Sequence, residues 1–84
     1  MIRWDPGESE RLKRERGVSF EEMLQAEVIC AVKHSGRPGQ RVLLVRYEGY
    51  VWAVPYVLNG EEVFLKTLFP SRKYTRLVKE GKLP

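Results

Sequence analysis

The chain has 84 residues, of which 43% are hydrophobic and 31% charged, and its formal net charge is +4. This length accommodates one domain, residues 1–84, and excludes two independent cores. No apolar run approaches the roughly 20 residues that a membrane-spanning helix needs, and the opening MIRWD lacks an apolar signal region. With Cys30 as the single cysteine, no internal disulfide can form, so we expect a cytoplasmic protein.

The start of the chain predicts a short strand at residues 2–4 and then two helices. Asp5 is typical of an N-cap, with Pro6 at the first helical position, and Gly17 is expected to end this strongly polar first helix. A capping box, Ser19 to Glu22, predicts the start of the second helix.

The second helix has no clear end in the sequence. Apolar residues keep helical spacing as far as Val32, yet residues 28–32 are also rich in β-branched side chains. Residues 28–34 therefore fit either a strand or a continued helix, and we favour a break near residue 27.

The second half predicts a meander of three antiparallel strands, 41–47, 50–58 and 62–69, after a loop at 36–39. The turns are expected at Glu48-Gly49 and Asn59-Gly60. The middle strand is apolar on both faces, as for a strand covered on two sides, and Pro55 predicts a bulge because it lacks a backbone donor.

A last helix is expected to begin at Ser71. The fold class is α+β, a curved antiparallel sheet with helices, in the order β-α-α-β-β-β-β-α.

The excess positive charge sits in the last fifth of the chain. Residues 1–65 hold nine Lys/Arg and ten Asp/Glu, whereas residues 66–84 hold six basic residues and Glu80. Arg72 and Lys73 fall in the first turn of the last helix, where the helix dipole disfavours cations. This placement predicts an anionic partner held by the helix N-terminus, and a solvated basic face is the alternative.

The site predicted at this end of the chain combines cations and rings. Lys66, Arg72, Lys73 and Arg76 are the candidate catalytic residues; Tyr56, Ser71, Tyr74 and Lys79 are candidate RNA-binding residues. One His and one Cys cannot build a zinc site, so no metal or cofactor is expected. Cys30 and His34 are a formal nucleophile–base pair, but Cys30 on a short strand is more simply a core residue.

Motifs at both ends resemble one known family. Near the start these are Trp4-Asp5-Pro6 and GVSFEE, residues 17–22; near the end they are Ser71-Arg72-Lys73 and Arg76. In order and spacing they resemble the BrnT-like toxins of bacterial type II toxin–antitoxin systems. The sequence departs from that pattern at Glu15-Arg16, where the family has Lys-His, and at Glu8, where it has a lysine.

The resemblance implies a RelE/ParE-like fold and a metal-independent ribonuclease that cleaves mRNA. It also implies a cognate antitoxin, of ribbon-helix-helix type, and RNA as partners, with the ribosome and a homodimer as open alternatives and no membrane. Arginine is no base at neutral pH, so Arg72 and Arg76 would clamp phosphate, while Lys66 or Lys73 would exchange protons if the cluster lowered its pKa. The alternative is a non-catalytic module of the same fold, a gyrase-inhibitor-like toxin or a regulator, which the lack of a clear acid–base pair favours.

Overall fold

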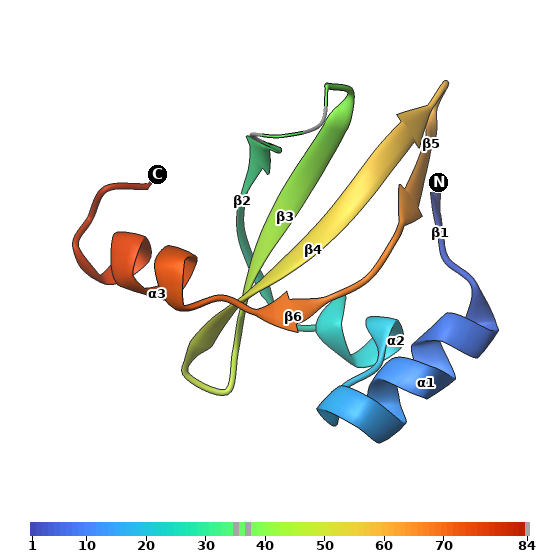
Figure 1. Cartoon of the computed structure of the whole chain (residues 1–84), viewed down its shortest axis with the longest axis horizontal. Coiled ribbons are helices and arrows are strands. Elements are labelled where there is room, and N and C mark those ends of the chain that lie inside the picture. The colour runs from blue at the N-terminus through green and yellow to red at the C-terminus, as the bar shows by residue number, and fades with distance from the viewer. Residues whose placement is uncertain (35, 37, 84) are drawn as a thin grey trace.

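A computed structural model describes residues 1–34, 36 and 38–83 of this chain. It is a small α+β domain with two N-terminal helices, a six-stranded sheet and a C-terminal helix (Figure 1). The elements are β1 (Ile2–Arg3), α1 (Pro6–Arg16), α2 (Phe20–Met23), β2 (Glu27–Lys33), β3 (Gln40–Tyr47), β4 (Tyr50–Asn59), β5 (Glu62–Leu65), β6 (Phe69–Pro70) and α3 (Arg72–Lys79).

The local signals at the N-terminus form as predicted. The Asp5 side chain accepts the Gly7 N–H at 2.8 Å, and α1 stops just before Gly17. Ser19 and Glu22 make the reciprocal capping box at the start of α2. That helix is only one turn long, and β2 follows at Glu27, so the break near residue 27 is confirmed and the continued helix is wrong.

The sheet is mixed rather than purely antiparallel. Its order is β1-β5-β4-β3-β2, and β6 pairs with β4 beyond β5. All pairs are antiparallel except β1 with β5, which is parallel. This correction comes from the first strand, because an isolated two-residue strand carries no signal of its partner or direction.

The third strand of the predicted meander is split into β5 and β6, and Pro55 explains where. The β3–β4 register runs unbroken past Pro55, so the predicted bulge does not lie within that pair. On the other side of β4 the Pro55 carbonyl accepts the Lys66 N–H at 2.9 Å. Because proline has no backbone N–H, Pro55 cannot donate a second hydrogen bond to this neighbour. Between the pairs Tyr56–Leu65 and Ala53–Phe69 the partner chain has one residue more than β4. The irregularity therefore falls opposite Pro55, in residues 66–68.

Both predicted turns are present, one of them shifted by a residue. Tyr47 pairs with Tyr50, so the first turn is Glu48-Gly49, with φ of 52° and 77° as a type I′ turn requires. Asn59 pairs with Glu62, so the second turn is Gly60-Glu61 rather than Asn59-Gly60. Of the predicted loop 36–39, residue 37 lies outside the described residues, and residue 36 and residues 38–39 are in turns.

The sheet is covered on both sides, as the apolar middle strand predicted. α1 and α2 pack on one face, around Leu12, Phe20, Val45 and Val54, and α3 packs on the other, around Leu44 and Ala53. Figure 1 shows α1 and α2 well separated from α3. Among the described residues, no helix is both long and apolar enough to cross a membrane. The two cores leave α3 alone on its face, which sets the shape of the site.

Candidate nucleic-acid interface

Two buried hydroxyl groups hold the N-terminus of α3, and one of them, that of Thr75, bonds it to β4. Ser71, which is 8% exposed, is the N-cap, and its side chain accepts the Tyr74 N–H at 3.1 Å. The Thr75 hydroxyl accepts the Val51 N–H at 2.9 Å and donates to the Ser71 carbonyl at 2.6 Å. Ser71 was a candidate RNA-binding residue, but its burial and its capping bond give it a structural role.

Exposed cations of α3 line an open groove, which we call the basic groove. Arg72, Arg76 and Lys79 follow one another at helical spacing and line it with Tyr50, Thr75 and Glu80 around a volume of about 440 Å³. No acidic residue lies in the first turn of α3. Cations at the positive end of a helix are unfavourable without an anion, so the arrangement is suited to binding phosphate. Glu80 lies at the far end, where it forms an ion pair with Lys82 at 3.5 Å.

Of the four candidate catalytic cations, Arg72 and Arg76 line the basic groove. Lys73 Nζ lies 5.6 Å from the ring centroid of Tyr74, and Lys66 Nζ lies 5.4 Å from that of Phe64. Neither lysine lines the basic groove. The irregularity opposite Pro55 leaves Lys66 just beyond the end of β5, where it lines a different hollow together with Pro55 and Thr67.

The two candidate stacking rings differ in burial. Tyr56 is 9% exposed and belongs to the core under α1 and α2, so it cannot serve as a stacking platform. Tyr74 is half-buried and lines a hollow of about 120 Å³ together with Phe69 and His34. Tyr50, which sequence reasoning missed, contributes a ring to the basic groove. Only the tertiary structure brings Tyr50 there, since it begins the strand against which α3 docks.

His34, which the sequence offered only as a formal partner of Cys30, lines a second site. It lies just beyond β2, and the hollow that it shares with Tyr74 adjoins a second hollow of about 320 Å³, lined by His34, Gln40, Pro55, Lys66 and Thr67. We call these two hollows together the His34 hollow. The ring Nδ1 accepts the Gly36 N–H at 3.1 Å, which orients the imidazole. In the sequence, His34 stood out only as the single histidine and as a formal partner of Cys30.

Neither site has the ligands that a metal centre needs. Within residues 1–34, 36 and 38–83, no group of three or more His, Cys, Asp or Glu side chains is placed to hold a metal ion. Cys30 is half-buried and packs with Val32 beside the α3 core. The chemistry available at this face is therefore that of cations, rings and one imidazole.

Comparisons of the chain with models of protein families, with curated proteins and with solved structures gave no match. The architecture above thus rests on the structure, and the likeness to toxins rests on the motifs quoted from the sequence.

Proposed function

We propose that this chain is a toxin of BrnT-like type with a RelE/ParE-like fold, a cytoplasmic ribonuclease that cleaves mRNA without a metal ion. A cognate antitoxin would neutralise it. The basic groove is the observation that supports this best, because three cations of one helix lie beside an aromatic ring in an open groove. Such a surface suits single-stranded RNA, whose phosphates pair with cations and whose bases stack on rings.

The chemistry follows from the residue types. Metal-free cleavage of RNA requires an activated 2′-hydroxyl, stabilisation of the charge on the phosphate and a proton for the leaving oxygen. Arg72 and Arg76, one helical turn apart, provide bidentate phosphate contacts and stabilise that charge. Lys73, in the first turn of α3 and over the ring of Tyr74, is the proposed proton carrier. Lys66 contributes only to an RNA that extends to the His34 hollow.

One observation favours a non-catalytic module of the same fold as the second candidate. Glu80 is the single carboxylate among the residues that line the basic groove, and it already pairs with Lys82. A general base must lie within hydrogen-bonding reach of the proton that it removes. A groove with three cations and one paired carboxylate is better equipped to bind RNA than to cleave it.

RNA cleavage by the purified chain tests the proposal. We expect RNA, alone or on ribosomes, to be cut in the presence of EDTA, and Arg72→Ala and Arg76→Ala each to lower the rate at least about 100-fold, as for loss of a charge-stabilising group. Arg14→Ala, which removes an equal charge from the exposed surface of α1, is the matched control and should cleave as wild type does.

Circular dichroism would confirm that all variants are folded. Full activity in folded Arg72→Ala and Arg76→Ala would refute the groove as the site. Binding of RNA without cleavage, with loss of binding in both variants, would favour the non-catalytic module.

Tyr74→Phe should lower the cleavage rate only mildly if the ring only packs or stacks, whereas a large loss of rate would assign the hydroxyl a proton-transfer role.

A further inference from the structure

The sheet face under α3 is only partly covered. Tyr74 and Val78 of α3 pack on Val42, Leu44, Val51 and Ala53. Further along the strands, away from the β3–β4 turn, the same face continues to His34, Gln40 and Phe64, which are half-buried or exposed. The His34 hollow lies where this coverage ends, so its floor is strand and one wall is the N-terminal turn of α3.

The hydrogen bonding of His34 determines which ring nitrogen carries the proton. Because Nδ1 accepts the Gly36 N–H, the neutral ring carries its proton on Nε2. The Lys66 ammonium lines the same hollow, and no carboxylate is among the described residues that line it. The polar groups here are thus mainly donors, which suits an anion.

Two further cations lie at the adjoining β2–β3 loop end. Lys33 and Arg41 are directly opposite each other in the β2–β3 pair, and both are exposed. Like charges at directly opposite positions destabilise a sheet. These two residues and His34 line a neighbouring depression at the end of the sheet. Because Arg41 is opposite Tyr56, the pair belongs to the α1–α2 face, and its positive potential lies around the end of the sheet from the His34 hollow. A bound polyanion would relieve the repulsion.

The opposite side of the His34 hollow is aromatic. Phe69, at 37% exposed, and Tyr74 line it together with Pro55. Exposed rings beside cations are the combination that binds single-stranded nucleic acid, because every base can stack and every phosphate can pair. A simple phosphate site would not use the rings, and an acidic peptide would use only the cations.

We propose that the His34 hollow binds one nucleotide of single-stranded RNA. Its phosphate lies against His34 Nε2–H and Lys66, and its base lies against Phe69 and Tyr74. This inference rests on the proposed function, because it extends the path of the RNA from the basic groove around the N-terminal turn of α3. It assigns His34 a binding role and Lys66 a phosphate contact.

The test uses the full chain and a fluorescein-labelled single-stranded 2′-O-methyl RNA oligonucleotide, which binds but cannot be cleaved. Fluorescence anisotropy should show affinity about tenfold weaker for His34→Ala, Lys66→Ala and Phe69→Leu. Gln places an amide donor near the position of Nε2, so His34→Gln should recover most of the affinity. Arg14→Ala is again the charge control. In ¹⁵N- and ¹³C-resolved NMR spectra, the His34 ring and Phe69 signals should shift on titration of the oligonucleotide.

The other outcomes of these titrations distinguish a failure of this inference from a failure of the proposed function. If Arg72→Ala weakens binding but His34→Ala, Lys66→Ala and Phe69→Leu match Arg14→Ala, this inference is overturned while the proposed function stands. If wild type binds no RNA, both fall. If inorganic phosphate or a polyglutamate peptide shifts the His34 and Phe69 signals and the oligonucleotide does not, the hollow is an anion or protein site instead.

Discussion

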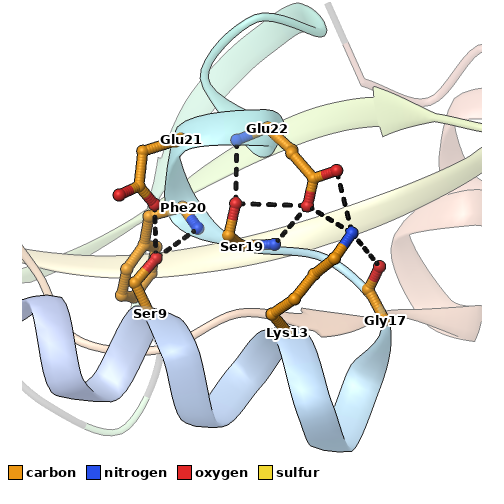
Figure 2. A network of polar contacts seen from close by, with 7 residues as sticks. All are labelled: Ser9, Lys13, Gly17, Ser19, Phe20, Glu21 and Glu22. Carbon is orange, nitrogen blue, oxygen red and sulfur yellow. Dashed lines mark hydrogen bonds and ion pairs between the residues drawn. The ribbon is translucent and has the colours of Figure 1, made fainter.

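At the scale of single residues, Ser9 joins the two N-terminal helices. Although α1 is strongly polar, Ser9 is only 2% exposed. Its hydroxyl donates to Glu21 Oε1 at 2.5 Å and accepts the Phe20 N–H at 3.0 Å, while Lys13 Nζ contacts both Glu22 carboxylate oxygens at 2.9 Å (Figure 2). One buried hydroxyl therefore satisfies the first free N–H of α2.

We expect Ser9→Ala to lower the free energy of unfolding by about 1–3 kcal/mol, because the buried Phe20 N–H then has no acceptor. Ser19→Ala, which removes the α2 N-cap in a more exposed position, should cost about 1 kcal/mol. Urea denaturation of both variants measures this. A smaller loss for Ser9→Ala than for Ser19→Ala would mean that water replaces the hydroxyl.

The same network predicts a pH dependence of stability. Hydrogen bonds from the Ser9 hydroxyl and from a backbone N–H lower the pKa of Glu21 below its ordinary value of 4.5. A depressed pKa in the folded state stabilises the fold at pH values above 4.5, and this contribution is lost as the pH falls through the folded value. The loss of melting temperature between neutral pH and pH 3 should therefore be smaller in Glu21→Gln than in wild type. Glu10→Gln, on the exposed surface of α1, is the control; an equal flattening in both variants would contradict the prediction.

At the scale of elements, α3 depends on a side chain to dock. The Ser71 N–H donates to the Val51 carbonyl, and the Val51 N–H donates to the Thr75 hydroxyl, so β4 continues its backbone pairing into the first turn of the helix. Thr75 thereby holds the start of the basic groove in place. Its burial, 8% exposed, makes this contact costly to lose.

Thr75→Val should therefore lower the free energy of unfolding by about 1–3 kcal/mol, since it keeps the shape and removes the acceptor. Thr75→Ser keeps the hydroxyl and should cost less. Hydrogen exchange of the Val51 amide is the direct readout, with faster exchange expected only in the valine variant. Unchanged protection there would show that another acceptor replaces Thr75.

At the scale of the whole molecule, the excess positive charge is concentrated at the C-terminal end of the chain, in α3 and its neighbours. When a protein pairs its cations with the phosphates of single-stranded RNA, counterions are released. A plot of the logarithm of the binding constant against the logarithm of salt concentration then has a slope of about −0.7 per phosphate contact. Three groove cations thus predict a slope of about −2. Arg76→Ala should reduce its magnitude by about 0.7, whereas Arg14→Ala should leave it unchanged. Anisotropy titrations across a salt series measure this, and a slope near zero in wild type would exclude phosphate pairing.

The sequence by itself determined the features that depend on neighbours along the chain. Residues a few positions apart set the caps at Asp5 and Ser19, the turn at Glu48-Gly49 and the start of α3. The apolar pattern of residues 50–58 likewise required a central strand covered on both sides. The positive charge of the last helix was equally plain, as a count of residues.

Only the tertiary structure decided what these elements contact. Pairings between distant segments decide the parallel pairing of β1, the split at residues 66–68 and the burial of Tyr56. They also place Lys66 in the His34 hollow and not in the basic groove. The burial of Ser9 could not be predicted from the sequence, because a serine in a polar helix is expected to be exposed. Its burial follows from its hydrogen bonds with Glu21 and Phe20 of the next helix. His34 gained its place beside Lys66 and Tyr74 for the same reason: local patterns fix backbone conformation, whereas a site is formed by side chains that the sheet brings together.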